Sequence, residues 1–259
     1  MQASALADAG LTPYHAIKLA LPRLSRAGTY ALVVGLGGLG LMAVQILKDL
    51  TGATVIATDM KPEAMAEAEK YGAVTVPSGE DQVARIREIT GGRGVDAAFD
   101  FVGIAATARA ALDSAAVQSR VTIVGIGNGS TIDWSFLSTP YEAELVTTYW
   151  GTVEELHELA GLYRDGKVEP LYTTYAMDGA LQAYRDLQDG KISGRAVVVR
   201  DHASASRRVS RPMPPRRRAR VWKALRSKSA PSRASCSARI CSQMRWPTLY
   251  AGACPGQPR

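Results

Sequence analysis

Short apolar runs alternate with segments of helical periodicity over most of the first 170 residues. The apolar runs are rich in β-branched residues, which is typical of strands buried in a parallel sheet. In the segments between them, apolar residues recur three or four positions apart, which is typical of helices that cover a sheet. The pattern therefore predicts an α/β fold with a doubly wound parallel sheet. The six expected strands are Ala31–Val34, Thr54–Thr58, Val74–Val76, Ala97–Phe101, Val121–Val124 and Leu145–Thr148.

Helices are expected between these strands. Pro62 suits the first turn of a helix, and Gly72 ends the same segment. Thr152 and Glu155 have the S/T-x-x-E spacing of a capping box, which predicts a helix that ends near Gly166. The other expected helices lie in Met1–Leu24, directly after Gly40, in Asp81–Thr90, in Ala105–Ala116 and, capped by Asp178 and ending near Gly190, in Tyr172–Val199.

The first expected strand ends in a cluster of glycines. Gly35, Gly37 and Gly40 fit the pattern G-x-G-x-x-G, and Gly38 is an additional glycine inside it. The second expected strand leads to Asp59, 19 residues beyond Gly40. A G-x-G-x-x-G pattern alone is weak evidence, because it often marks only a tight turn. The succession of strand, glycine turn, helix, strand and acid favours a dinucleotide-binding site over a purely structural turn.

Each of these residues has a physical task in dinucleotide binding. Gly35 allows the tight turn, Gly37 lets the backbone approach the pyrophosphate, and Gly40 lets helix and strand pack closely. The N-terminus of the following helix offers unpaired N–H groups and a partial positive charge to the phosphates. Asp59 would accept hydrogen bonds from the adenosine ribose, and its charge repels a 2′-phosphate. The sequence therefore predicts NAD rather than NADP as the cofactor.

Charge divides the chain into two parts. The whole chain has a formal net charge of +7, but 14 of its 31 basic residues and none of its 24 acidic residues lie between 202 and 259. Residues 1–201 therefore hold 17 basic and 24 acidic residues, a net charge of −7. All three cysteines, Cys236, Cys241 and Cys254, lie in the basic part. Because the sequence has no apolar run of about 18 residues and no signal peptide, we expect a cytoplasmic protein that does not bind membranes.

Residues 201–259 are rich in Arg, Ser, Pro and Ala and show no regular periodicity. This composition predicts a disordered tail. A shifted reading frame in GC-rich coding sequence would produce it, a hypothesis that comparing the three frames would test. The alternative is a nucleic-acid-binding tail whose basic residues neutralise phosphates while Trp222 and Trp246 stack on bases. Because no nucleic-acid-binding motif is recognisable, we favour a solvated polycation.

Seven short segments resemble, in the correct order, the zinc-type medium-chain alcohol dehydrogenases. They are DAGLTPYHA, VVGLGGLG, ATDMK, DFVG, VGIG, YWGT and GRAVVV, and the similarity covers about Ala5–Val199. The resemblance implies NAD-dependent oxidation of a primary or secondary alcohol, or reduction of a ketone or aldehyde, with zinc polarising the oxygen. It also implies a homodimer or homotetramer assembled through the sheet domain.

The resemblance assigns roles to individual residues. Thr12 corresponds to a residue beside the nicotinamide and is the candidate catalytic residue, and Arg195 corresponds to one that pairs with the pyrophosphate. The other implied cofactor contacts are Gly35, Gly37, Gly38, Leu39 and Gly40 at the pyrophosphate turn, Asp59 and Lys61 at the adenosine ribose, and Val102, Val124 and Ile126 around the cofactor's ribose and nicotinamide.

Asp8 lies where the family has the third ligand of its catalytic zinc. Catalytic zinc needs three protein ligands and an open position. The resemblance places the other two ligands, a Cys and a His, on an upstream domain that this sequence does not contain. Asp8 is therefore expected to be an orphaned zinc ligand; the alternative is a helix cap or a surface acid. We expect the chain to bind NAD and to oxidise alcohols little or not at all.

These observations divide the chain into four expected parts. They are a remnant of a GroES-like catalytic domain with its linking helix at 1–25, a Rossmann NAD-binding domain at 26–170, a return segment to the catalytic domain at 171–200, and the tail at 201–259.

Two other enzyme classes fit the sequence less well. A short-chain dehydrogenase needs a catalytic Tyr-x-x-x-Lys pair, and Tyr163 and Lys167 have that spacing but flank the expected end of a helix. Its glycine pattern, G-x-x-x-G-x-G, is also missing. A methyltransferase that uses S-adenosylmethionine usually has an acid just before the first glycine, where this chain has Val33 and Val34.

Overall fold

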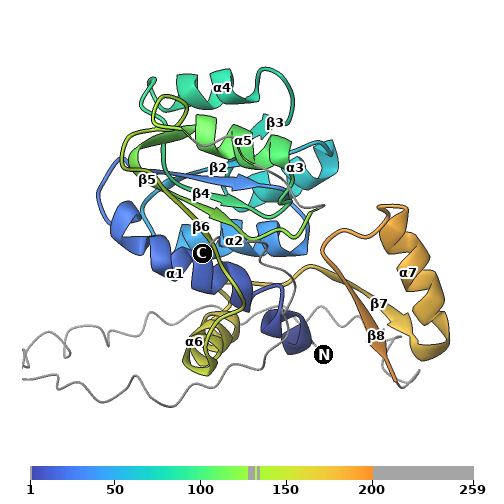
Figure 1. Ribbon diagram of the computed structural model, residues 1–259. Helices are drawn as coiled ribbons and strands as arrows, with labels where there is room; N and C mark the ends of the chain where they lie inside the picture. Colours follow the sequence, from blue (N-terminus) through green and yellow to red (C-terminus); the bar gives the residue numbers. More distant parts are fainter. Residues whose placement is uncertain (1, 128–131, 133–134, 201–259) are drawn as a thin grey trace, which may run out of the picture. The chain divides into compact units, whose positions relative to one another are not determined.

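The structure is a computed structural model, and it describes residues 2–127, 132 and 135–200. The apolar runs form one six-stranded sheet in the order β3-β2-β1-β4-β5-β6 (Figure 1). All neighbouring strands are parallel, and the order of the strands reverses between β1 and β4. The predicted fold class, an α/β fold with a doubly wound sheet, is confirmed. The strands are β1 (Tyr30–Val34), β2 (Thr54–Asp59), β3 (Val74–Pro77), β4 (Val95–Asp100), β5 (Ala115–Ile123) and β6 (Glu144–Thr147).

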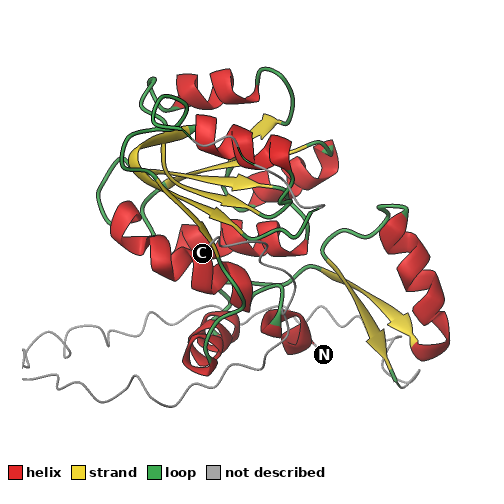
Figure 2. Cartoon of the chain, in the orientation of Figure 1, coloured by secondary structure: helices red, strands yellow, loops and turns green. Residues whose placement is uncertain are grey.

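Helices cover both faces of this sheet (Figure 2). On one face α1, α2 and α3 pack on the strands around a core that includes Ile17, Leu47 and Phe99, and α6 packs on α1 and η1. On the other face α4 and α5 bury Ile86 and Leu112. Because the central strands are covered on both sides, most of their residues are apolar and buried, and the polar exceptions include Asp96 and Asp100 of β4. The helices are α1 (Leu11–Leu24), α2 (Gly38–Leu50), α3 (Pro62–Lys70), α4 (Gln82–Ile89), α5 (Ala105–Asp113) and α6 (Val153–Arg164), with a 3-10 turn, η1 (Gln2–Ala7), before α1.

The largest difference from the predicted elements lies around β5. The helix expected over Ala105–Ala116 ends three residues earlier, and the strand expected over Val121–Val124 begins already at Ala115. Gln118 has a positive φ of 59°, and the pairing of β5 with β4 shifts in register. The first part of β5 thus lies before an irregularity in the ladder, and alternation of apolar residues does not indicate such a shift.

Two predicted helix N-termini are confirmed and one is wrong. Thr152 and Glu155 form the capping box of α6: the N–H of Thr152 donates to the Glu155 carboxylate at 2.9 Å, and the N–H of Glu155 donates to Oγ1 of Thr152 at 3.2 Å. Pro62 occupies the first turn of α3. Asp178 was expected to cap the last helix, but the N-cap is Gly179, and Asp178 belongs to the 3-10 turn before it.

The chain from 172 to 199 forms a two-stranded parallel sheet with one helix (Figure 1). Leu181, Tyr184 and Leu187 of this helix are exposed. The segment reaches the functional site through the turn that joins the helix to the last strand. Its elements are β7 (Tyr172–Ala176), η2 (Met177–Gly179), α7 (Ala180–Gln188) and β8 (Arg195–Val199).

No helix within residues 2–127 and 135–200 is long and apolar enough to cross a membrane. The predictions for the tail at 201–259, for its three cysteines and for its two tryptophans lie outside the described residues. The division of the chain into four parts stays a prediction.

Candidate functional site

A cavity of about 430 Å³ lies at the carboxyl ends of β1 and β2. In open α/β sheets, ligands bind at this end of the strands, where the strand order reverses. Two segments far apart in the sequence form its walls, because residues 36–64 line one side and residues 190–194 the other. The lining residues are Leu36, Gly37, Asp59, Lys61, Glu63, Ala64, Gly190, Lys191, Ile192, Ser193 and Gly194.

The glycine turn follows β1 directly. Gly35 has a φ of +86°, which L residues rarely adopt, and its N–H donates to the carbonyl oxygen of Thr58 at 2.9 Å. A Cβ on Gly40 would overlap the carbonyl oxygen of Gly35, so the turn and the start of α2 are in direct contact. A Cβ on Gly37, in contrast, would meet no atom within 4 Å. The protein itself does not fill the space beside Gly37, and that space is open to a ligand.

Helix α2 begins at this turn with an uncapped N-terminus. Its N-cap is Gly37, and no side chain bonds to the first turn as a cap. The first N–H groups of a helix lack partners within the helix and carry a partial positive charge. Leu39, another predicted contact, is half-buried in this first turn. An anion in the cavity would therefore meet backbone donors at the N-terminus of α2.

Asp59, the last residue of β2, connects the glycine turn to the start of α3. One carboxylate oxygen accepts a hydrogen bond from the N–H of Leu36 at 2.6 Å, and the other accepts one from the N–H of Lys61 at 2.9 Å. A carboxylate has about four acceptor positions, so two remain for a ligand. Asp59 lines the cavity, a position from which it could accept hydrogen bonds from ribose hydroxyls.

Gly194 and Arg195 pack on the glycine turn, and residues 190–194 line the cavity beside it. The sequence resemblance predicted this approach only for Arg195. The ammonium of Lys61 donates to the carbonyl oxygen of Gly190 at 3.0 Å. A Cβ on Gly38 would lie 2.7 Å from Cδ of Arg195 and 3.0 Å from the carbonyl oxygen of Gly194. Gly38 therefore makes room for the return segment. The paired glycines of GKISGR, at each end of the turn, are the sequence signal for this second wall.

Arg195 also forms an ion pair with Asp8, which follows the 3-10 turn η1. The side chain of Arg195 is 37% exposed and that of Asp8 is 52% exposed. Burial lowers the pKa of the Arg195 guanidinium, which nevertheless stays charged at neutral pH. The structure thus joins two residues that the sequence resemblance assigned to different ligands, a pyrophosphate and a zinc ion.

The residues predicted around the nicotinamide lie on the loops that follow β4 and β5. A Cβ on Gly35 would lie 2.6 Å from Cγ2 of Val102, so the loop after β4 packs on the glycine turn. A Cβ on Gly125 would overlap the backbone of Val102, so the two loops also touch each other. Val124 is half-buried, and Ile126 is 99% exposed. Val102 is thus in contact with the glycine turn, and Ile126 projects into solvent.

Asp100, at the end of β4, positions these loops. Its carboxylate accepts hydrogen bonds from the N–H groups of Val102 and Gly103 at 2.9 and 3.0 Å and from the hydroxyl of Thr107 at 2.8 Å. Its carbonyl oxygen accepts a further one from the N–H of Val124 at 2.8 Å. These hydrogen bonds satisfy the fully buried carboxylate of Asp100. Asp100 therefore affects the site only through the backbone that it holds in place.

Thr12 lies in the first turn of α1. Its side chain is buried, with 6% exposure, and its hydroxyl has no hydrogen-bond partner among the described residues. Buried hydroxyls are normally paired, and Ser119 and Thr122 also have unpaired buried hydroxyls among the described residues. Thr12 does not line the cavity at the carboxyl ends of β1 and β2, so its predicted role beside the nicotinamide stays a prediction. His15, three residues further along α1, joins this helix to α6: its Nδ1 lies 2.8 Å from the carboxylate of Glu155.

Zinc does not fit the described residues as a catalytic metal. Within residues 2–127, 132 and 135–200, no three His, Cys, Asp or Glu side chains are placed to hold a metal ion together. Asp8, the predicted ligand, is instead engaged with Arg195. No chemical step through zinc is therefore derived for this chain.

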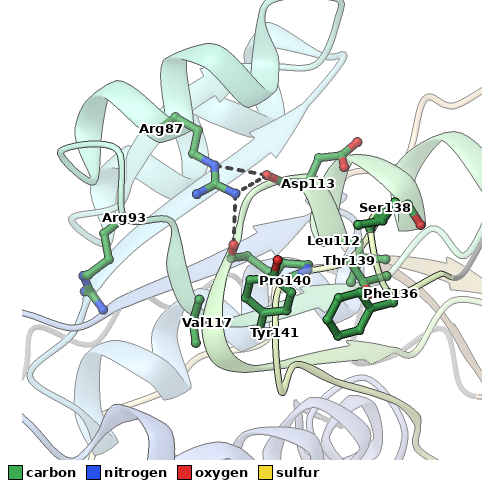
Figure 3. Close-up of a pocket in the computed structure, with 12 residues that line it drawn as sticks. Arg87, Arg93, Leu112, Asp113, Val117, Phe136, Ser138, Thr139, Pro140 and Tyr141 are labelled. Atoms are coloured by element: carbon green, nitrogen blue, oxygen red, sulfur yellow. Dashed lines mark hydrogen bonds between the residues drawn. The ribbon is translucent and has the colours of Figure 1, made fainter.

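A second cavity, of about 390 Å³, lies beside the amino ends of β4 and β5 (Figure 3). Arg87 and Arg93 lie on one side, and the exposed side chains of Val117, Phe136 and Tyr141 on the other. None of the residues predicted to bind a cofactor lines it.

Comparisons with known proteins agree with this arrangement. The family described as "Zinc-binding dehydrogenase" matches residues 38–164. An NAD-dependent alcohol dehydrogenase of Sulfurisphaera tokodaii is 32% identical over 202 residues, 77% of this chain and 58% of the relative. The solved alcohol dehydrogenase of Aeropyrum pernix superposes with a TM-score of 0.71 at 37% identity, over 77% of this chain and 58% of that one. A D-arabinose 1-dehydrogenase (NADP(+)) of Saccharolobus solfataricus is 28% identical over 77% of this chain and 58% of the relative.

The sheet order, the glycine turn and the acid at the end of β2 define a Rossmann-like α/β protein. The similarity in sequence and structure narrows this class. The chain belongs to the zinc-binding dehydrogenase family. It spans about 58% of the length of the curated relatives that it matches.

Proposed function

We propose that this chain is the NAD-binding part of an NAD-dependent alcohol dehydrogenase. The observation that carries the proposal is Asp59, whose carboxylate faces the cavity and is fixed by the N–H groups of Leu36 and Lys61. This acid lies beside the uncapped N-terminus of α2 and the open space at Gly37. The cavity thus offers acceptors for two ribose hydroxyls next to donors for a pyrophosphate.

In the proposed complex each part of the cavity holds one part of the cofactor. The first turn of α2 binds the pyrophosphate through backbone N–H groups, together with Arg195. Asp59 accepts hydrogen bonds from the adenosine ribose, and the loops of Val102 and Val124 hold the nicotinamide half. The buried hydroxyl of Thr12 supplies a polar contact beside the nicotinamide. When bound, NAD would accept a hydride from the alcohol carbon at C4 of its nicotinamide ring.

Asp59 favours NAD over NADP for an electrostatic reason. A 2′-phosphate on the adenosine ribose would place a second negative charge against a carboxylate whose geometry is fixed by two backbone donors. The relatives differ in cofactor, since one is named for NAD and another for NADP(+). The cofactor therefore has to be inferred from this chain's own residues.

The substrate class is inferred from the family and not from the residues that line the cavity. We propose a primary or secondary alcohol as the substrate, with the ketone or aldehyde as the product. We also propose that the chain alone oxidises alcohols little or not at all, because its described residues do not form a catalytic metal site. Assembly as a homodimer or homotetramer and location in the cytoplasm stay predictions.

The proposal is tested by calorimetric titration of the full chain with NAD and NADP. We expect the unaltered chain to bind NAD at least roughly tenfold more tightly than NADP. Asp59→Asn should lower the affinity for NAD roughly tenfold or more and should reduce the ratio of NAD to NADP affinity. Asp81→Asn, an exposed acid at the start of α4 without a capping bond, is the matched control and should change neither affinity. Equal affinities of the unaltered chain for the two cofactors, or no binding of either, would overturn the proposal.

A further inference from the structure

Arg195 stands between two cavities. Its aliphatic stem packs on the first turn of α2, as shown by the 2.7 Å between Cδ and a Cβ placed on Gly38. Its neighbour Gly194 lines the cavity at the carboxyl end of the sheet, and Arg195 itself lines a smaller cavity of about 260 Å³ together with Ser4 and Asp8. The guanidinium is therefore within one side-chain length of the glycine turn, and at present it pairs with Asp8.

Asp8 offers Arg195 the same chemistry that a phosphate offers. Both are anions with oxygen acceptors, and a guanidinium binds either one through charge-assisted hydrogen bonds. One guanidinium cannot point its fork at Asp8 and at a phosphate on the turn simultaneously without sharing its donors. Asp8 lies outside the sheet, between η1 and α1. These two elements position it, and not a contact with Asp59 or with the glycine turn.

We propose that Asp8 competes with the pyrophosphate of the dinucleotide for the guanidinium of Arg195. Asp8 then sets the affinity for phosphate-bearing ligands, because each binding event has to break the Asp8–Arg195 pair and each release event restores it. Adenosine, which has no phosphate, is not subject to this competition. The inference rests on the proposed function, since it takes the glycine turn as the phosphate site.

The size of the effect follows from the exposure of the pair. Both side chains are more than one third exposed, so water screens their attraction. An ion pair of this kind changes an equilibrium by roughly two- to fivefold. Asp8→Asn should therefore tighten the binding of NAD and ADP roughly two- to fivefold and leave the binding of adenosine unchanged.

The matched control removes a similar charge elsewhere. Asp165→Asn takes away an exposed carboxylate at the end of α6, which also has an arginine neighbour, at 3.7 Å in Arg164. It lowers the negative charge of the chain by the same amount but should leave NAD affinity unchanged. If Asp165→Asn tightens NAD as much as Asp8→Asn does, a general charge effect explains the result and the inference is wrong.

A double-mutant cycle separates competition from a structural effect. Arg195→Gln should weaken NAD roughly tenfold, because it removes the charged donor. In the Arg195→Gln background, Asp8→Asn should no longer change NAD affinity. A gain that persists without Arg195 would show that Asp8 acts by another route.

A measurement on the unaltered chain tests the idea even if the Asp8 variants do not fold. Saturation with NAD or ADP should speed amide hydrogen exchange in residues 4–10, because Asp8 loses its partner, whereas adenosine should not. Unchanged or slower exchange with NAD would overturn the inference. If NAD affinity depends on Asp59 but is not raised in Asp8→Asn, this inference alone fails; if the unaltered chain binds no dinucleotide, the proposed function fails with it.

Discussion

The cavities at the two ends of the sheet have similar volumes, about 430 and 390 Å³, but they differ in what their polar groups are doing. At the carboxyl end, Asp59 has acceptor positions left, and the N-terminus of α2 has no side-chain cap. At the amino end, the guanidinium of Arg87 donates to the carbonyl oxygens of Asp113 and Ala115 at 2.7–3.1 Å (Figure 3). It also donates to the carbonyl oxygen of Gly92 at 3.1 Å.

The same contrast holds for the second arginine at the amino end. Arg93 donates to both carboxylate oxygens of Asp96 and to the carbonyl oxygen of Gly28. Its charge is therefore neutralised within the protein, and this pairing raises the pKa of Arg93. A cavity with two arginines would suggest an anion site from composition alone. The hydrogen bonds show that these arginines join the ends of helices and strands. The two cavities therefore differ in the hydrogen-bonding capacity left for a ligand and not in volume, and this difference favours the carboxyl-end cavity as the proposed cofactor site.

The largest expected effect comes from two glycines of the same turn. Gly40→Ala would force a Cβ into the carbonyl oxygen of Gly35. Such overpacking costs about 1–3 kcal/mol or more of the free energy of unfolding, and it should abolish NAD binding by moving the turn. Gly37→Ala meets no protein atom and should cost less than about 1 kcal/mol. It should still weaken NAD binding roughly tenfold or more, because its methyl group would occupy the space proposed for the pyrophosphate.

Thermal unfolding and calorimetric titration of the two variants separate these cases. If Gly37→Ala destabilises the fold as much as Gly40→Ala does, the two glycines do not differ in their structural role. If Gly37→Ala binds NAD as tightly as the unaltered chain, the open space beside Gly37 is not the phosphate site.

The next largest effect lies at the amino end. Arg87→Ala would leave three carbonyl oxygens without their donor and should lower the free energy of unfolding by about 2–3 kcal/mol. Its NAD affinity should be unchanged. Arg85→Ala, on the exposed side of the same helix, is the matched control and should stay within about 0.5 kcal/mol. Chemical denaturation measures the stability of both variants. If Arg87→Ala binds NAD more weakly under conditions in which it is fully folded, the amino-end cavity is not independent of NAD binding and the contrast between the two ends of the sheet is wrong.

Local sequence patterns were sufficient for most of the fold. Five of the six strands were predicted to within two residues at each end, because strands buried on both faces are short apolar runs between polar or glycine boundaries. Strand β5 was the exception. Its first residues depend on Gln118 adopting a positive φ and on a register shift, and neither leaves a mark in the apolar pattern.

The candidate site likewise contains residues whose proximity could be predicted from local sequence and residues that only tertiary packing brings together. Gly35, Gly40 and Asp59 are close in sequence and belong to one β–α–β unit, so their spacing alone indicated that they meet. The wall at residues 190–194 and the ion pair of Asp8 with Arg195 join segments more than 100 residues apart. Such contacts follow from tertiary packing, and even the family resemblance suggested only that Arg195 would approach the turn.

The smallest expected effect is a pH dependence on the amino-end side of the sheet. A hydrogen bond from Arg120 at 2.7 Å, with a second from Arg23 at 3.0 Å, holds the pKa of Glu144 below its usual value of 4.5. A carboxyl group whose pKa is lower in the folded state stabilises the fold above its unfolded pKa, and this stabilisation is lost as the pH falls through the folded pKa.

Glu144→Gln should therefore lower the free energy of unfolding at pH 7 by only about 0.2–1 kcal/mol, because the side chain is 42% exposed and water screens the pair. As the pH falls from 4.5 through the lower pKa of Glu144 in the folded state, the difference between the variant and the unaltered chain should shrink and then vanish, since protonated Glu144 no longer attracts either arginine. Denaturation curves at several pH values measure the difference. A difference that stays constant down to pH 3 would show that packing, and not charge, makes Glu144 stabilising. A change in NAD affinity at pH 7 would show instead that the two ends of the sheet are coupled.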